Sequence, residues 1–271
     1  MKRVEARPKR LDSRLKPILD DLYSRYNRPE YITPDPLQFV VGYPDVRDRE
    51  IAGMIASSLA FGNIAQILRS ISGILDTMTR PCSFLLETDD REIRRRFAGF
   101  RHRFVSDREF TAMLIGVKRA INRHGSLHGL FAHGMRPEHD SVLPALEHFV
   151  QQLRAEAGRD LKFLLPSPRD GSACKRLLLF LRWMVRHDAV DPGGWVDLSA
   201  EKLVVPLDTH LFRIARQLGF TDRKQANLRT ALEVTEAFRR ICPEDPVKYD
   251  FVLTRFGIHP KLSKQYRQHK W

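Results

Sequence analysis

The stretch that decides the fold, residues 170–219, reads DGSACKRLLLFLRWMVRHDAVDPGGWVDLSAEKLVVPLDTHLFRIARQLG. It opens with a turn over residues 170–172, whose composition is typical of a helix start. The apolar run at 177–181 then predicts a buried helix. A second start follows at Asp208, which we expect to cap a helix over 211–218 that ends at a glycine. The stretch therefore predicts two helices joined by a long loop.

Two charged side chains lie at the starts of these helices, Lys175 in the first turn of one and Asp208 at the cap of the other. A helix N-terminus carries partial positive charge, so it disfavours an ammonium ion and favours a carboxylate. Partial burial would add to the first effect and favour a neutral, nucleophilic amine. Such a pair suits chemistry that passes through a developing cation. A simple cap and a solvated lysine explain the same residues, so spacing alone leaves both interpretations open.

Three segments carry a resemblance to the endonuclease III superfamily, the helix-hairpin-helix DNA glycosylases. Residues 205–219, VPLDTHLFRIARQLG, resemble the aspartate-bearing segment of that superfamily. Its hairpin usually reads Pro-Gly-x-Gly-x-Lys, and residues 170–175, DGSACK, align with it. Gly171 keeps the first glycine of the hairpin, whereas Ala173 replaces the second. Residues 50–63, EIAGMIASSLAFGN, are similar to an early helix of the superfamily and the loop after it.

The resemblance spans about 48–258 and extends to an uncharacterised bacterial family usually attached to this superfamily. It implies an all-α, two-lobed helix-hairpin-helix DNA glycosylase fold with a central helical barrel. Residues 48–188 would form the barrel lobe, with the hairpin at about 167–175. Residues 1–47 plus 189–271 would form a second helical lobe that carries the catalytic aspartate. Helical periodicity along most of the chain, without an alternating strand pattern, also predicts an all-α fold.

Helix boundaries elsewhere follow from local signals. Ser106 and Glu109 have the spacing of a capping box, which predicts a helix that runs to about Arg123. Near the end of the chain, the pattern predicts a last helix over 247–256 that ends at Gly257.

The function that the resemblance implies is a DNA base-excision repair glycosylase with abasic-site lyase activity. Lys175 would be the nucleophile, and Asp208 would help deprotonate it and stabilise positive charge at the sugar. The long interval between the two is closer to the archaeal 8-oxoguanine glycosylase branch, which suggests 8-oxoguanine as the excised base. Damaged duplex DNA is the expected partner, and RNA is an alternative substrate. We expect a monomer that is cytoplasmic and associated with the nucleoid.

The same resemblance implies further site residues. The hairpin would bind the DNA backbone through its N–H groups, at Gly171, Ser172, Ala173 and Cys174. A structural monovalent cation could bind there too. Thr209 and His210 would approach the DNA backbone, and Asn63 would probe the duplex. Phe61 and Trp195 would shape a base pocket, although Phe61 fits a core position equally well.

Composition agrees with a nucleic-acid partner. Lys and Arg total 46 against 33 acidic residues, which gives a net charge of +13. Such a balance in a folded protein points to a polyanion. The three cysteines are too few for the four-cysteine iron–sulfur cluster of many endonuclease III relatives, and the lyase chemistry requires no catalytic metal or redox cofactor. No apolar run approaches the length of a membrane span.

Two other functions fit parts of the sequence. A non-catalytic DNA-binding protein of the same fold would share the basic surface and the hairpin. The pair His187-Asp188, completed by His124, Asp208 or Asp250, would suit an HD-type metal-dependent phosphohydrolase. At the end of a helix, His187 and Asp188 could equally be a favourable terminal charge and the start of a turn.

Overall fold

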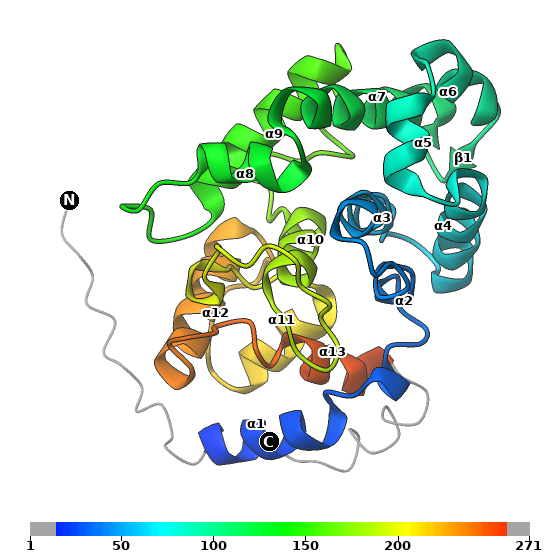
Figure 1. Ribbon diagram of the computed structural model, residues 1–271. Helices are drawn as coiled ribbons and strands as arrows, with labels where there is room; N and C mark the ends of the chain where they lie inside the picture. Colours follow the sequence, from blue (N-terminus) through cyan, green and yellow to red (C-terminus); the bar gives the residue numbers. More distant parts are fainter. Residues whose placement is uncertain (1–14, 259–271) are drawn as a thin grey trace.

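The computed structural model describes the backbone of residues 15–258 and the side chains of residues 15–255, and within these the chain is mostly helical. Figure 1 shows the helices α1 Leu15–Tyr26, α2 Leu37–Val40, α3 Val46–Ser58, α4 Ile64–Met78, α5 Pro81–Glu87, α6 Asp90–Arg96, α7 Asp107–His124, α8 Leu127–Gly134, α9 Leu143–Ala157, α10 Lys175–Val185, α11 Thr209–Gln217, α12 Leu228–Ile241 and α13 Asp250–Ile258. Three short 3₁₀ helices add η1 Pro29–Tyr31, η2 Pro168–Asp170 and η3 Ala200–Lys202. In the described part of the chain, no helix is both long and apolar enough to span a membrane.

One small β-hairpin departs from the all-α expectation. Strands β1 Arg101–His102 and β2 Val105–Ser106 pair antiparallel, with Arg103 at the turn in a left-handed conformation. Strands of two residues are too short to show an alternating pattern, which is why the sequence does not reveal them. The buried His102 ring bonds both the Ser70 hydroxyl at 2.9 Å and the Phe61 carbonyl at 3.1 Å. The hairpin is thereby fixed against the loop between α3 and α4.

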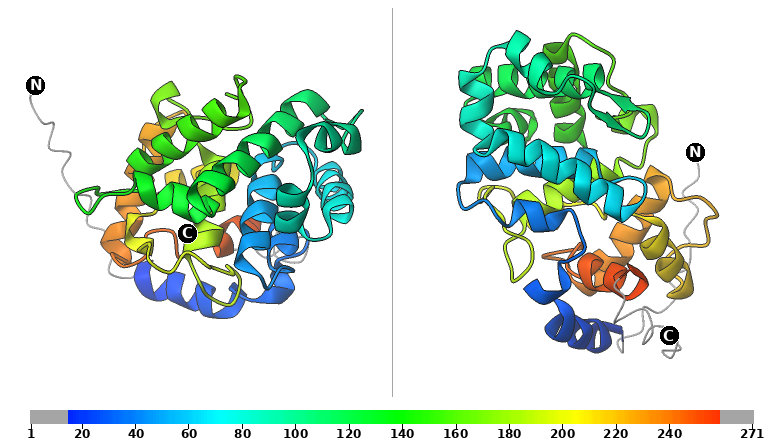
Figure 2. Two further views of the ribbon diagram at one scale, coloured as in Figure 1. Left: turned by 45° about the horizontal axis from the view of Figure 1, so that its top comes forward. Right: turned by 90° about the vertical axis from the view of Figure 1, so that its right-hand side faces the viewer.

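The helices gather in two groups with α10 between them. Helices α3 to α9 lie together on one side, whereas α11, α12 and α13 lie on the other (Figure 1, Figure 2). Helix α1 packs on α13, so the two ends of the described chain meet in the second group. The exact lobe boundaries at residues 48 and 188 stay a prediction, as does the more specific helix-hairpin-helix fold.

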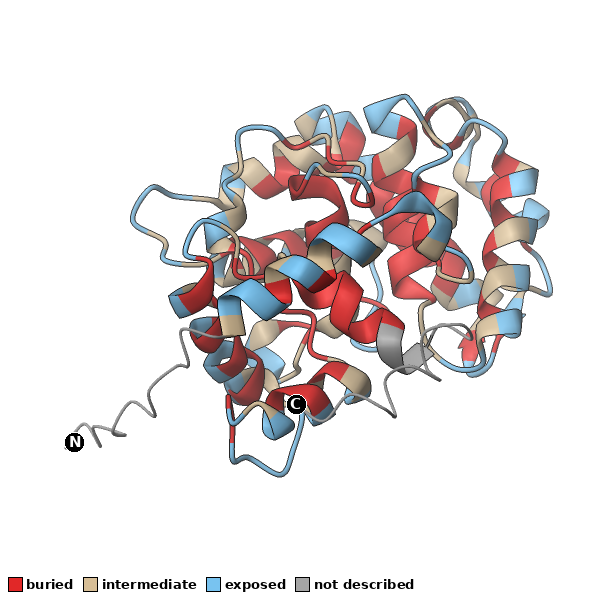
Figure 3. Ribbon diagram, turned by 90° about the horizontal axis from the view of Figure 1, so that it is seen from below, coloured by how far each residue is buried: buried red, intermediate tan, exposed pale blue. Residues whose placement is uncertain are grey.

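The core is built around α3 and α10, which pack against each other. Ten of the thirteen α3 residues are buried, because this helix is covered by others on nearly every side. Gly53 allows the close approach, since a Cβ there would lie 3.3 Å from the ring of Phe180. The apolar run at 177–181 is buried as predicted, except at Leu179. In Figure 3 buried residues gather on the inner faces of the helices and exposed residues on the outer faces.

Local signals placed some helix ends correctly and others not. The capping box at Ser106 and Glu109 is present, with both side chains bonded to the opposite backbone N–H, and α7 runs one residue beyond the expected end. The last helix begins at Asp250 rather than 247 and continues through Gly257 to Ile258, so the predicted stop at that glycine is wrong. A glycine ends a helix when it adopts a left-handed conformation, and Gly257 instead stays helical.

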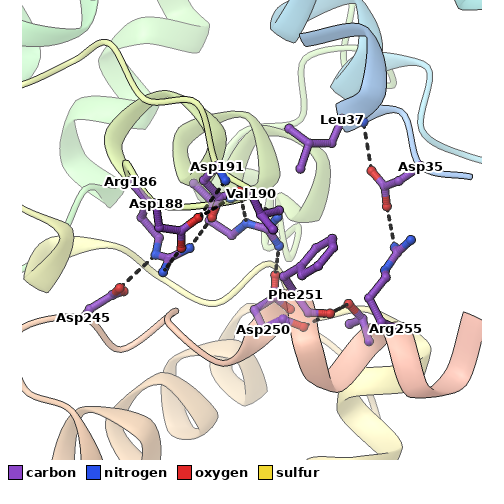
Figure 4. Close-up of polar contacts among 12 residues, drawn as sticks. Asp35, Leu37, Arg186, Asp188, Val190, Asp191, Asp245, Asp250, Phe251 and Arg255 are labelled. Atoms are coloured by element: carbon purple, nitrogen blue, oxygen red, sulfur yellow. Dashed lines mark hydrogen bonds and ion pairs between the residues drawn. The ribbon is translucent and has the colours of Figure 1, made fainter. Parts of the chain in front are cut away.

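A buried network of ion pairs ties α10 to the loop after it and to α13 (Figure 4). Asp191, which is fully buried, accepts from Arg182 at 2.9 Å and from Arg186. Arg182 also donates to Asp250 at 2.5 Å, and Arg186 donates to Asp245 at 2.8 Å. Burial of these charges costs free energy that only such pairing offsets.

Loss of the shared carboxylate should therefore destabilise the fold. We expect Asp191→Asn to lower the free energy of unfolding by roughly 3 kcal/mol, because two buried arginines lose a charged partner. Urea unfolding at neutral pH measures the change. The control is Glu92→Gln, which removes exposed ion pairs to Arg95 and Arg96 and should cost much less than Asp191→Asn. Equal losses for the two variants would contradict a central role for the network.

Candidate active site

A cavity of about 770 Å³ lies between the two groups of helices. Its wall includes the loop between α3 and α4, the segment from Lys162 to Arg176, the start of α11 and the face of α13. Its volume suits a small molecule or one group of a larger ligand. The charged residues of its lining nearly balance, with five basic residues against four acidic ones.

Lys175 enters this cavity from the first position of α10. The turn before it is tight, because Gly171 and Cys174 both adopt left-handed conformations, and Ser172 Oγ accepts from the Cys174 N–H at 3.2 Å. The thiol of Cys174 lies under the turn and bonds the Pro166 carbonyl, and burial raises its pKa to about 12. The Lys175 side chain is 39% exposed, so its amine is accessible from the cavity.

Asp208 faces Lys175 from the N-cap of α11. Its Oδ1 accepts from the Leu211 N–H at 2.7 Å, as predicted for a cap. Its Oδ2 lies 3.8 Å from Lys175 Nζ, and the side chain is only 12% exposed. One oxygen thus holds the carboxylate in place while the other faces the amine. The structure brings together two residues that are separated by 33 positions in the sequence.

The other predicted site residues fall into two sets. Those that line the cavity are Phe61, Ser172, Ala173, Cys174, Thr209 and His210. Gly171 shapes the turn without lining the cavity, and Asn63 caps α4 by accepting from the Ala65 N–H at 3.0 Å. The expectation that Trp195 shapes a base pocket is wrong. Its side chain is fully buried outside the cavity lining, and its indole N–H donates to Glu50 at 2.7 Å. The loop that carries Trp195 instead folds back onto α3, where Glu50 lies.

Several cavity residues were not predicted. Arg176 stands beside Lys175 with its guanidinium over the rings of Phe163 at 4.4 Å and Phe61 at 5.1 Å. It donates to the carbonyls of Ser58 and Phe163, and burial lowers its pKa to about 10. Asp35, Arg182 and Arg255 also line the cavity. No local pattern marks these residues, because they come from segments far apart in the chain.

The residues of the alternative phosphohydrolase site serve other purposes. Asp188 pairs with Arg186 at 2.8 Å and accepts from the Tyr23 hydroxyl at 2.7 Å, and His187 bonds the Pro192 carbonyl. His124 lies beside His133, with ring centroids 5.7 Å apart. Within residues 15–255, no group of three or more His, Cys, Asp or Glu side chains is arranged to hold a metal ion.

The chain matches a known protein family over most of its length. A family described as protein of unknown function, DUF2400, matches residues 35–259. The chain belongs to this family. The match includes Lys175, Asp208 and the cavity-lining face of α13. No curated protein and no solved structure matches the chain.

The two roles of Asp208 can be separated by substitution. Asparagine caps a helix about as well as aspartate, so Asp208→Asn should leave the free energy of unfolding within about 0.5 kcal/mol of the wild type. Asp208→Ala removes the bond to Leu211 and should cost about 1 kcal/mol. Urea unfolding of both variants checks this expectation. Equal losses with asparagine and with alanine would show that the charge, rather than the cap, stabilises this helix.

Asp250 should give the fold a pH dependence. Burial raises the pKa of this carboxyl from 3.8 to about 6, although Arg182 opposes the shift. A carboxyl with a raised folded-state pKa stabilises the fold fully below about pH 4 and loses that contribution as the pH rises through about 6. The free energy of unfolding of the wild type minus that of Asp250→Asn should therefore fall between about pH 4 and pH 7. Urea unfolding across this range measures it, and a constant difference would contradict the raised pKa.

Proposed function

We propose that the protein is a DNA base-excision glycosylase with abasic-site lyase activity, and that Lys175 is its nucleophile. The observation that carries the proposal is the Lys175–Asp208 pair at the wall of the cavity, with 3.8 Å between Nζ and Oδ2. The resemblance of residues 170–175 and 205–219 to the endonuclease III superfamily supports it, as does the net charge of +13. The more specific helix-hairpin-helix fold belongs to the same proposal.

The reaction begins when a damaged nucleotide leaves the base stack and enters the cavity. Lys175 transfers a proton to Asp208, and the neutral amine attacks C1′ of the sugar. The glycosidic C1′–N bond breaks, and its electron pair leaves with the base, which takes up the proton that Asp208 received, so that Asp208 is again a carboxylate. The Asp208 carboxylate stabilises the positive charge that develops at the sugar.

The lyase step follows on the covalent adduct. The C1′–O4′ bond opens and O4′ takes a proton from the attached nitrogen, which leaves a protonated Schiff base between C1′ and the lysine nitrogen. Removal of a proton from C2′ then expels the 3′ phosphate by β-elimination and breaks the strand. The resemblance to the archaeal 8-oxoguanine branch makes 8-oxoguanine the first base to test.

Borohydride trapping tests the chemistry directly, because it reduces the Schiff base to a stable amine. The substrates are duplex and single-stranded DNA, and RNA, that carry an abasic site, 8-oxoguanine, uracil or thymine glycol. We expect a covalent adduct with the wild type, none with Lys175→Ala, and a rate at least about 100-fold lower with Asp208→Asn. Lys162→Ala is the matched control, because Lys162 also lines the cavity but pairs with Asp160 at 3.2 Å.

Three results would count against the proposal in different ways. An adduct that persists in Lys175→Ala would move the nucleophile elsewhere. Base release without any adduct would indicate a glycosylase that uses water instead of the lysine. DNA binding without base release or strand cleavage on any substrate would indicate a non-catalytic DNA-binding protein.

A further inference from the structure

The floor of the cavity carries polar groups that the lyase chemistry does not use. Asp250 and Arg255 both line the cavity from α13, and both are buried, with 4% and 3% of their surface exposed. Figure 4 shows them on one stretch of the helix, with Phe251 between them in sequence. Neither residue contacts Lys175 or Asp208 by any hydrogen bond or ion pair among the described residues.

Arg255 is only partly satisfied. Its Nη2 pairs with Asp35, and its guanidinium lies 5.1 Å from the ring centre of Phe251. Its Nε and Nη1 are buried and have no hydrogen-bond partner among the residues the structure describes. A buried donor without a partner costs free energy, and in a cavity wall such a donor indicates a bond to a ligand.

Asp250 presents the complementary group. Its Oδ2 accepts from Arg182 at 2.5 Å, whereas its Oδ1 is buried and without a partner in the described part of the chain. A carboxyl oxygen can accept from a ring N–H, and in its protonated form it can donate to a ring nitrogen or carbonyl. The floor therefore offers strong donors from Arg255 and an adaptable group from Asp250.

Charge decides which ligand fits the floor. Arg255 is already paired with Asp35, and Asp250 and Asp208 add two more carboxyl groups to the same cavity. With five basic and four acidic residues in the whole lining, the cavity offers an anion no large excess of positive charge. A neutral, planar ligand that carries both carbonyl acceptors and ring N–H donors would satisfy the open positions on both residues.

We propose that Asp250 and Arg255 form a nucleobase-recognition subsite, in which Arg255 donates to a ring acceptor and Asp250 bonds the neighbouring edge of the base. This inference rests on the proposed function, because it identifies the part of the substrate that enters the cavity. The subsite binds the base that is excised, while Lys175 and Asp208 act on the sugar. The rate of base excision should thus depend on Asp250 and Arg255. The rate of cleavage at an abasic site, where no base is present, should depend on these two residues much less.

The test compares two reactions in the same full-length variants. Arg255→Lys keeps a cation for Asp35 but removes the guanidinium donors, and Asp250→Asn keeps an acceptor for Arg182. We expect both to slow excision of the preferred base in single-turnover assays at least tenfold more than they slow abasic-site cleavage. A parallel loss of both reactions would show a structural role, and no loss would show that the floor does not contact the base. Either outcome overturns the subsite.

Matched controls come from the same ion-pair network. Arg186 and Asp245 pair with each other, and neither lines the cavity. Arg186→Lys and Asp245→Asn therefore disturb buried ion pairs without reaching the ligand. We expect them to leave the ratio of base excision to abasic-site cleavage at the wild-type value. A ratio that changed equally in the controls would overturn the subsite, because the effect would then come from stability.

A binding measurement separates this inference from the lyase chemistry. In a Lys175→Ala background, fluorescence anisotropy compares duplexes holding 8-oxoguanine, uracil or thymine glycol with a duplex holding tetrahydrofuran, an abasic analogue without a base. We expect Arg255→Lys to weaken binding of the preferred base at least fivefold more than binding of tetrahydrofuran. If the protein binds a base-containing duplex more tightly than the tetrahydrofuran duplex, and Arg255→Lys abolishes this preference, the subsite is supported. This holds even where the wild type forms no borohydride adduct. The absence of any base preference overturns the subsite even where the adduct forms.

Discussion

The buried pairing of Arg182 and Arg186 with Asp191 is the constraint on which the rest of the structure depends. Arg182 lies in the last turn of α10 and Arg186 is the C-cap of that helix. One oxygen of the Asp191 carboxylate accepts from Arg182 and the other accepts from Arg186. Because neither guanidinium reaches solvent, the loop after α10 must fold back to bring Asp191 to them. Arg182 extends the network to Asp250 and so fixes α13 relative to α10. The same ion pairs therefore hold both α10, which begins with Lys175, and α13, which forms the floor of the cavity.

Lys175 and Asp208 are positioned by the starts of the two helices that carry them. Asp208 uses one oxygen to cap α11, which leaves the other oriented toward Lys175. Lys175 follows a turn with two left-handed residues, so its place at the first position of α10 is set by the backbone. The two side chains therefore meet through backbone geometry rather than through a strong mutual ion pair, and the amine keeps its access to the cavity.

Charge is distributed unevenly between the cavity and the rest of the chain. The sequence carries a net charge of +13, yet the cavity lining holds nearly equal numbers of basic and acidic residues. A basic surface attracts a polyanion over several ångströms, whereas a balanced cavity favours a neutral group. This division agrees with a proposed substrate whose phosphates stay outside and whose base enters. Arg176, held between Phe163 and Phe61, has a lowered pKa and belongs to the wall rather than to the charged surface.

The sequence by itself determined the elements that depend on local signals. The capping box at Ser106, the cap at Asp208 and the buried run at 177–181 could be predicted because capping and periodicity involve residues close together in the chain. The resemblance of two short segments was enough to select Lys175 and Asp208, although only the structure shows their separation of 3.8 Å.

Only the tertiary structure decided the rest, because it depends on which distant segments meet. Trp195 was expected at a pocket, but the loop that carries it packs into the core, where Glu50 accepts from its indole. Arg255 gave no local signal, and Asp250 was considered only for an HD-type metal site, since a charged residue in a helix is ordinarily exposed. Their burial at the cavity floor follows from the packing of α13 against α11 and α1, which no short stretch of sequence encodes.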